Sequence, residues 1–293
     1  MKDYLLFTDA TCDLSIDIAN EFNIKIIPMG FTLGSDSYNH YVDFRELNRQ
    51  AFYNRLENGE IAKTTAIPPI FYLEYFKPYL ENGHDILYLC FSSGLSSTYQ
   101  NAVLATNELK ESYPDSNILV IDTLAASSGE GLLAIEAANK RLQGLSLQEN
   151  YDYIQSIKMK LNHFYTPSDL FFLKRGGRIS GSKAVVGTAL KIKPILTVDF
   201  QGKLVPYKNT RGRKKALGEI VTTLVNRIEN PDQATVIIAC ADCEEDREFL
   251  NKKLNDAIKV KKIYNTYLGP VIGAHTGKSL ASVYFIGKDR QEN

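Results

Sequence analysis

The chain has 293 residues, of which 44% are hydrophobic, and its 34 Lys and Arg residues balance its 34 Asp and Glu residues. These numbers predict a globular protein long enough for two domains, and they exclude the strong positive field that non-specific nucleic-acid binding requires. We therefore expect no nucleic-acid partner and no more than transient contact with a membrane surface.

The apolar segments of the chain are all shorter than a membrane span, and its amino end enters a strand pattern instead of the apolar core of a signal peptide. These features predict a cytoplasmic location. The four cysteines fit this location, because a chain of this size needs no disulfide framework.

The first half of the chain alternates strand and helix patterns, which predicts a mostly parallel, Rossmann-like sheet. Asp13 and Asp43 precede two of the helical stretches and are expected to cap them. Pro68 and Pro69 make residues 63–69 extended. The predicted strands cover residues 4–9, 24–29, 31–33, 87–91 and 117–122, and the predicted helices cover residues 16–22, 47–56, 70–80, 98–110, 128–142 and 146–161.

A serine-rich turn follows the strand over residues 87–91. Its small side chains leave backbone N–H groups and hydroxyls facing the space beyond the carboxyl end of the strand, where open α/β sheets bind ligands. The next helix needs only one hydroxyl as a cap, from Ser96 or Ser97. Ser92 and Ser93 exceed that need, so they are candidates for ligand binding.

The pattern changes near His163, where we place the boundary between an amino-terminal domain of residues 1–162 and a carboxy-terminal domain of residues 163–293. A hairpin pattern over residues 192–198 and 204–208 indicates that the second domain is mixed α/β. Further helices are predicted over residues 184–190, 213–228 and 244–254, and further strands over residues 234–240, 261–267 and 282–286.

Metal ligands are not evident. Cys240 and Cys243 have CxxC spacing, but the neighbours of a redox loop and a second pair for zinc are missing, so we interpret the pair as incidental. The four histidines do not have the spacing of metal ligands either.

His275 stands out because residues 269–277 are rich in glycine and small side chains, which let a ligand or another segment approach the backbone closely. A histidine in an apolar segment is otherwise usually a core residue.

Two known motifs are incomplete, because a required glycine is missing at its expected position in each. Residues 277–279 resemble the end of a phosphate-binding P-loop, but Ile272 stands where the first glycine belongs. Phe91 likewise replaces the first glycine of a Gly-x-Ser-x-Gly elbow around Ser93. The sequence therefore predicts no nucleotide site and no typical hydrolase elbow.

Two basic clusters are candidates for contact with a partner. The first surrounds a glycine pair at residues 174–178 and includes Arg178, and the second runs over residues 208–215 and includes Arg211. Cations at the start of a helix oppose its dipole, so the second cluster indicates a docking surface or an anion site.

Taken together, these segments resemble the DegV family over nearly the whole chain. The matching residues are Thr8-Asp9, Thr65 with Pro68, Ser92-Ser93-Gly94-Leu95-Ser96 with Thr98-Tyr99-Gln100, residues 173–179, Ile192-Lys193-Pro194-Ile195, Arg211-Gly212 and residues 269–277. The chain departs from the family pattern at Ala66, Ile67, Ser97 and Lys278-Ser279.

The resemblance implies a fatty-acid-binding protein of the kind that serves as the lipid-binding subunit of bacterial fatty-acid kinase. Such a protein is a carrier and not itself an enzyme. It holds a long-chain fatty acid, with no other cofactor, in a tunnel with the carboxylate at a cleft between two domains, and it presents that carboxylate to a separate kinase for acyl-phosphate formation.

The resemblance also implies roles for individual residues. Thr65, Ser93 and His275 would bind the carboxylate, and Arg178 and Arg211 would face the kinase or the acyl phosphate. The supporting residues would be Thr64, Ser92, Gly94, Ser96, Gly273, Thr276 and Gly277.

Two other functions stay open. A serine acyl hydrolase could use Ser93 and His275 as nucleophile and base, although the sequence names no acidic residue to orient the histidine. A subunit that binds a small, triose-like metabolite would need a polar pocket instead of an apolar tunnel.

Overall fold

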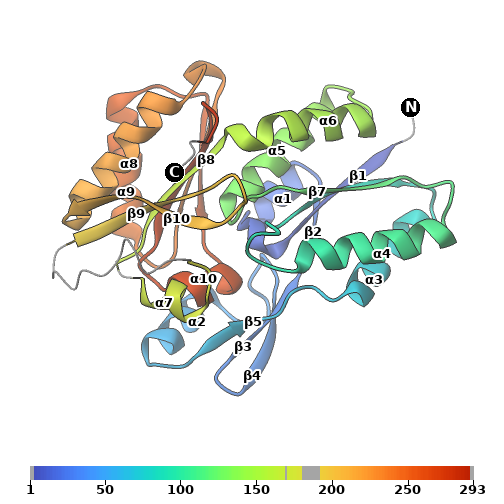
Figure 1. The fold of residues 1–293 in the computed structure, drawn as a ribbon, viewed down its shortest axis with the longest axis horizontal. Helices are drawn as coiled ribbons and strands as arrows, with labels where there is room; N and C mark the ends of the chain where they lie inside the picture. Colours follow the sequence, from blue (N-terminus) through green and yellow to red (C-terminus); the bar gives the residue numbers. More distant parts are fainter. Residues whose placement is uncertain (1–2, 169, 180–191, 291–293) are drawn as a thin grey trace.

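The computed structural model describes residues 3–168, 170–179 and 192–290. The predicted helix over residues 184–190 lies outside these ranges. Within them the chain forms two α/β halves, one with a parallel sheet and one with a mixed sheet, as predicted for the fold class, and a third, small sheet (Figure 1). No helix in the described ranges is long and apolar enough to cross a membrane.

The amino-terminal half contains a four-stranded sheet, in the order β2-β1-β6-β7, whose neighbouring strands are all parallel. Alternate residues of β6 face opposite sides, so Tyr88 packs toward α3 and α4 while Leu87 and Leu89 pack toward α5 and α6. The predicted parallel sheet is confirmed. Its elements are β1 (Tyr4–Asp9), β2 (Ile24–Ile27), β6 (Asp85–Cys90), β7 (Ile118–Asp122), α3 (Pro69–Leu80), α4 (Thr98–Ser112), α5 (Ser128–Leu142) and α6 (Leu147–Ile157).

Both predicted aspartate caps are wrong. Ser15 caps α1 (Ile16–Glu21), and Asn48 caps α2 (Arg49–Glu57), because a cap must directly precede the first helical turn and these helices begin at residues 16 and 49. A one-turn 3₁₀ helix, η1 (Ala10–Cys12), follows β1 instead. Asp13 is buried, and Asp43 pairs with Arg45 on the surface.

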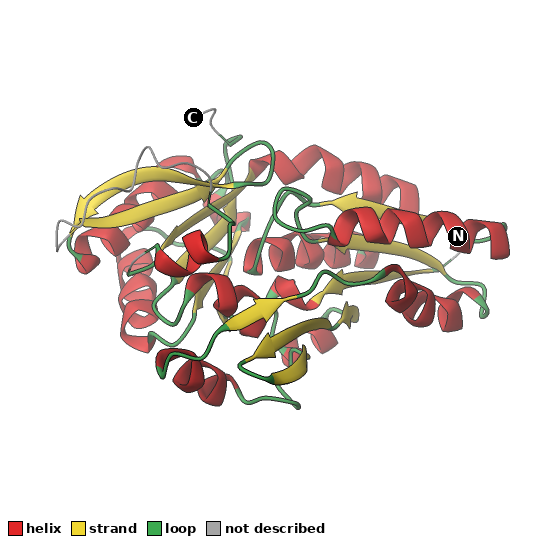
Figure 2. Cartoon of the chain, turned by 60° about the horizontal axis from the view of Figure 1, so that its bottom comes forward, coloured by secondary structure: helices red, strands yellow, loops and turns green. Residues whose placement is uncertain are grey.

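A small antiparallel sheet, in the order β4-β3-β5, lies beside α10 (Figure 2). The sequence predicted its β3 segment but not the separate sheet. Its strands are β3 (Met29–Leu33), β4 (Asp36–His40) and β5 (Ala62–Thr64). β5 ends at Thr64, and the extended segment after it leads to Pro69, where α3 begins.

The carboxy-terminal half contains a six-stranded mixed sheet, in the order β10-β9-β8-β13-β11-β12. The predicted hairpin is confirmed as the β9–β10 pair, and β11 and β12 are parallel. Its strands are β8 (Leu161–Thr166), β9 (Ile192–Val198), β10 (Leu204–Arg211), β11 (Thr235–Cys240), β12 (Lys262–Tyr267) and β13 (Ala281–Ile286), and its helices are α7 (Phe171–Arg175), α8 (Arg213–Arg227), α9 (Glu244–Ala257) and α10 (Pro270–Thr276).

The prediction of a helix through residue 161 is wrong. The chain leaves the helix at Ile157, passes through a 3₁₀ turn, η2 (Lys158–Lys160), and enters β8 at Leu161. All six residues of β8 are buried, so this strand lacks the alternation that marks a half-exposed strand. Another 3₁₀ turn, η3 (Pro231–Gln233), precedes β11.

Helix α5 packs between the two large sheets and contacts β1 and β6 on one side and β8, β11 and β13 on the other (Figure 1). Glycines permit this close packing. A Cβ atom at Gly129 would lie 2.2 Å from His163 Nε2, and one at Gly131 would lie 2.7 Å from the carbonyl oxygen of Cys12. The helix therefore joins the two halves through direct contact of its backbone.

A buried carboxyl group lies in the first turn of α5. Glu130 accepts a hydrogen bond from Thr8 Oγ1 at 2.6 Å and lies 2.7 Å from Thr11 Oγ1, which also contacts Asp9 Oδ1. The Thr11 hydroxyl has one proton, so it can donate to only one of the two carboxyl groups. The other carboxyl group must be protonated and donate to Thr11.

Glu130 is the group that carries this proton. Burial, followed by the nearby charge of Asp9, raises the pKa of Glu130 well above its usual range. Burial also raises the pKa of Asp9, but this carboxyl group accepts hydrogen bonds from Tyr88 Oη and the Phe91 N–H, which favour its ionised form. The pair links β1, η1, α5 and the end of β6.

The tip of the β9–β10 hairpin rests on the serine-rich turn after β6. Ser92 Oγ donates to the carbonyl oxygen of Gly202 at 2.8 Å, and the Gly94 N–H donates to Ser92 Oγ. A Cβ atom at Gly94 would lie 2.4 Å from the carbonyl oxygen of Gln201. Ser92 and Gly94 therefore hold the two halves together.

We expect Gly94→Ala to lower the free energy of unfolding by about 2 kcal/mol, because its methyl group would overlap the hairpin backbone. Gly218→Ala is the matched control: no atom lies within 4 Å of its added Cβ, and this position is inside α8. That change should raise stability by about 0.5 to 1 kcal/mol. Denaturant unfolding of both variants tests the difference, and equal effects would contradict the described contact.

Candidate functional site

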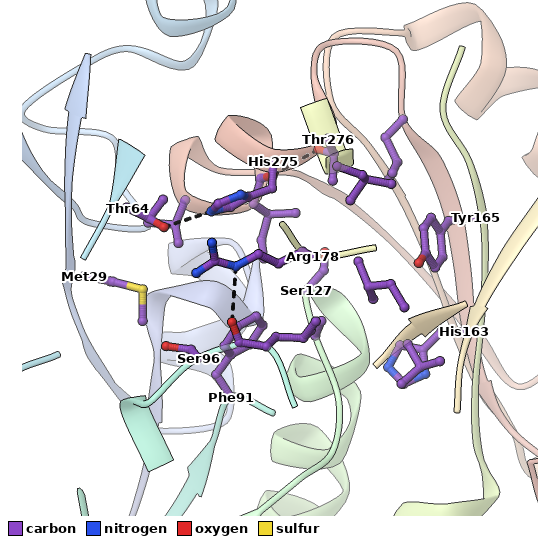
Figure 3. Close-up of a pocket in the computed structure, with 18 of the residues that line it drawn as sticks. Met29, Thr64, Phe91, Ser96, Ser127, His163, Tyr165, Arg178, His275 and Thr276 are labelled. Atoms are coloured by element: carbon purple, nitrogen blue, oxygen red, sulfur yellow. Dashed lines mark hydrogen bonds between the residues drawn. The ribbon is translucent and has the colours of Figure 1, made fainter. Parts of the chain in front are cut away.

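A cavity of about 250 Å³ lies where β5, the turn after β6, the start of α5, helix α10 and the six-stranded sheet come together (Figure 3). Most of its wall is apolar, formed by Met29, Ala66, Phe91, Leu95, Ala126, Leu173, Val198, Leu204, Val271, Ile272 and Leu280. The polar lining residues are Thr64, Thr65, Ser96, Ser97, Ser127, His163, Tyr165, Arg178, His275, Thr276 and Tyr284. Both halves of the chain contribute to the wall, so the cavity exists only in the assembled fold.

One side of the cavity gathers polar side chains around His275. Its Nε2 lies 2.8 Å from Thr64 Oγ1, and its Nδ1 is buried without a hydrogen-bond partner in the described part of the chain. Thr65, the residue after Thr64, also lines the cavity. A Cβ atom at Gly176 would lie 2.2 Å from His275 Nδ1, so the glycine lets the loop after α7 pack against the imidazole.

The imidazole of His275 is neutral at physiological pH. Burial lowers its pKa from 6.5 to about 4, and the positive charges of Arg178 and Arg175 add to this effect. A neutral imidazole carries one donor and one acceptor nitrogen. It can therefore hydrogen-bond Thr64 and one further polar group at the same time.

Arg178 lies in the wall of the cavity on the same side as His275 (Figure 3). Its Nε donates to the carbonyl oxygen of Leu95 at 3.3 Å, which ties the loop after α7 to the serine-rich turn. This arrangement places a positive charge at the polar side of the cavity. An anionic group there would find a cation as well as hydroxyl donors.

The structure separates the other predicted site residues into two groups. Thr64, Thr65, Ser96, His275 and Thr276 line the cavity together. The predicted residues that do not line it are Ser92, Ser93, Gly94, Gly273, Gly277 and Arg211.

Several residues of the second group have packing roles. The Ser93 N–H donates to Asp122 Oδ1 at 3.1 Å, and its turn neighbours Ser92 and Gly94 contact the hairpin. A Cβ atom at Gly273 would lie 2.6 Å from Tyr53 Oη, and Gly277 has a φ of +72°. The participation of Ser93 in ligand binding stays a prediction.

The second basic cluster is partly paired. Lys208 forms an ion pair with Glu219, and Arg213 pairs with Asp246 at 2.7 Å while donating to the carbonyl oxygen of Thr166. Arg211 is exposed at the end of β10. Its predicted contact with a partner therefore rests on exposure and charge.

The sequence missed Ser127, which begins α5 and lines the cavity. It donates to Asp13 Oδ2 at 2.5 Å, and Asp13 Oδ1 accepts from the Gly269 N–H. Burial raises the pKa of Asp13 to about 8. Ser127 has φ 55° and ψ −147°, a conformation that non-glycine residues rarely adopt. No local pattern predicts a contact between residues so far apart in the chain.

No three His, Cys, Asp or Glu side chains in the described ranges gather as a metal site. Cys240 is buried and Cys243 begins α9, with its thiol 3.2 Å from the carbonyl oxygen of Leu280. Both thiols are free.

The model of a family described as uncharacterised DegV proteins matches residues 4–288 of this chain. The chain belongs to the DegV family. A DegV domain-containing protein of Clostridium perfringens is 39% identical over 291 residues, which are 99% of this chain and 100% of that protein.

Solved structures of DegV proteins extend the comparison. A fatty-acid-binding DegV protein of Thermus thermophilus is 27% identical with a TM-score of 0.88, covering 98% of this chain and 100% of that one. A stearic-acid-binding protein of Eubacterium ventriosum is 25% identical with a TM-score of 0.86, covering 97% of this chain and 98% of that one. These DegV neighbours bind fatty acids.

We expect the ligand-free DegV protein to lose stability as the pH falls from about 6.5 to about 4, partly through His275. The pKa of this imidazole is about 4 in the folded chain against 6.5 as the ordinary value, so over this window the unfolded chain binds a proton that the folded chain does not. The stability that the group contributes is present above pH 6.5 and is lost on acidification, by about 3 kcal/mol at most. His275→Gln should flatten this loss in denaturant unfolding. An unchanged pH profile in the variant would contradict the assignment of a neutral imidazole.

Proposed function

We propose that this DegV protein binds a long-chain fatty acid in the cavity, with the carboxylate on the side of Thr65 and His275. The single observation that carries the proposal is the mostly apolar wall with polar groups around His275 on one side. Burying an acyl chain stabilises the complex by about 0.8 kcal/mol per CH₂ group, whereas a carboxylate removed from water needs donors. The cavity offers both environments.

The polar side of the cavity fits a carboxylate in charge as well as in hydrogen bonding. The Thr65 hydroxyl is a donor in the wall, and the Arg178 guanidinium supplies positive charge beside it. The neutral imidazole of His275 can donate from one nitrogen, depending on its tautomer. The fatty-acid-binding DegV proteins of known structure support the same ligand class.

The two rival functions fit less well. A serine hydrolase needs a nucleophile hydrogen-bonded to its base, but in the described ranges His275 bonds Thr64 and no hydrogen bond joins it to Ser93. A triose-like metabolite would leave the apolar wall without a partner. We therefore propose a carrier and not an enzyme.

We expect delipidated protein to bind one stearic acid molecule per chain, and Thr65→Val to weaken this binding at least tenfold. The variant keeps the shape of the side chain but removes a hydrogen bond to a charged group, which contributes about 1.5 to 3 kcal/mol. Thr222→Val, an exposed position on α8, is the control and should leave affinity unchanged. Calorimetric titration measures both. Absence of stearic acid binding to the folded wild-type protein would refute the proposed function.

We further propose that the bound carboxylate is presented to a fatty-acid kinase, which converts it to an acyl phosphate. The basis is the exposed cationic surface near residue 211, together with the resemblance described above. Arg211 lies outside the cavity, so it is free to contact a partner without touching the ligand.

Arg211→Ala should leave the affinity for stearic acid unchanged and slow kinase-dependent acyl-phosphate formation about tenfold, since it removes one charged contact of the docking surface. Radiolabelled phosphate transfer with a purified fatty-acid kinase measures the rate. Lys253→Ala, on α9, is a charge-matched control. Equal rates for wild type and Arg211→Ala would show that this surface does not bind the kinase.

A further inference from the structure

The side of the cavity away from His275 also contains polar groups. His163 and Tyr165 project from the same face of β8, and Figure 3 places them across the cavity from Thr64. Leu196 pairs with Tyr165 in the neighbouring strand, and Val198 continues the same apolar face. An acyl chain that extends from the carboxylate site along this wall would reach His163 and Tyr165.

Both side chains are almost fully buried, with 2% of His163 and 5% of Tyr165 exposed. Neither ring nitrogen of His163 has a hydrogen-bond partner in the described part of the chain, and the Tyr165 hydroxyl has none there either. Of their polar neighbours in the wall, Ser127 donates to Asp13, and the Tyr284 hydroxyl is not among the buried atoms without a partner. In this part of the wall, the polar groups without a hydrogen-bond partner therefore belong to these two side chains.

Such groups are costly in a wall that contacts only hydrocarbon, because each loses its hydrogen bonds to water on burial. Burial lowers the pKa of His163 well below its usual range, so its ring is neutral and offers one donor and one acceptor. The phenol of Tyr165 is likewise a donor and an acceptor. A ligand group that hydrogen-bonds both side chains should therefore be able to donate as well as to accept.

An alcohol has this property, whereas a keto oxygen only accepts. A second carboxylate would bring a charge between two neutral side chains, and the guanidinium of Arg290, whose charge helps to lower the pKa of His163, already donates to the carbonyl oxygens of Leu161 and Leu124. We propose that His163 and Tyr165 form a second polar subsite that binds a hydroxyl group on the acyl chain, so that the protein prefers a hydroxylated fatty acid to the unsubstituted acid of the same length. This inference rests on the proposed fatty-acid-binding function.

The experiment compares stearic acid with a positional series of monohydroxystearic acids, by calorimetric titration of delipidated wild-type protein. At least one of the monohydroxystearic acids should bind about fivefold more tightly than stearic acid. This gain is expected for one or two neutral hydrogen bonds to side chains that otherwise have no partner. The other positions should bind more weakly than stearic acid, because their hydroxyl would lie against the apolar wall.

Tyr165→Phe keeps the ring and removes only the oxygen. It should abolish the hydroxyl preference, which is measured within the variant as the ratio of its affinities for the hydroxystearic acid and for stearic acid. Tyr264→Phe, on β12 outside the cavity, is the control and should keep the preference. Thermal unfolding of each variant verifies that it is folded, and the wild-type series tests the proposal without any variant.

The outcomes separate the two proposals. Binding of stearic acid without any preference among the hydroxystearic acids would overturn the subsite and leave the carrier function standing. A preference that survives in Tyr165→Phe would overturn the assignment to this residue pair. Failure of stearic acid and of every hydroxystearic acid to bind would overturn both.

Discussion

The fold depends on placing a carboxyl group, Glu130, in the first turn of a helix that contacts sheets on both sides. Charged, this group would destabilise the core, so it is held in its protonated form and hydrogen-bonded to hydroxyls. Its link to Asp9 fixes the carboxyl ends of β1 and β6 relative to α5. The serine-rich turn, whose Ser96 and Ser97 line the cavity, directly follows β6, and Ser127 directly precedes α5.

The cavity therefore forms only when these elements pack together. β5 supplies Thr64, α10 supplies His275, α5 supplies Ser127, and β8 supplies the wall on the other side. No single element contains a site. The two sides of the cavity differ in charge. On the side of His275 the cation Arg178 lines the wall, whereas on the side of His163 the lining donors and acceptors are neutral and the nearby cation, Arg290, lies outside the wall and donates to backbone carbonyl oxygens. A ligand with an anionic end is therefore expected to place it beside Arg178.

The sequence predicted elements whose signals are local. The run into Cys90 and its serine-rich turn marked β6 and α4, and Gly202 marked the hairpin. It missed β8, whose continuous burial gives no period, and α10, a seven-residue helix rich in small residues. For the site, the sequence indicated the segments but not which side chains line the cavity. The direction of Ser93 depends on the hairpin that packs beside its turn. The contact of His275 with Thr64 joins residues that are 211 positions apart in the chain.

The contact of the hairpin tip with Ser92 and Gly94 has a consequence for the lifetime of the protein in the cell. Because the halves share α5 and this contact, we expect them to unfold as one unit. A ligand between them would then add to the stability of the whole chain by mass action. Empty chains are then the better substrates for proteases. With the ligand proposed above, the steady-state amount of the protein would follow the supply of fatty acid.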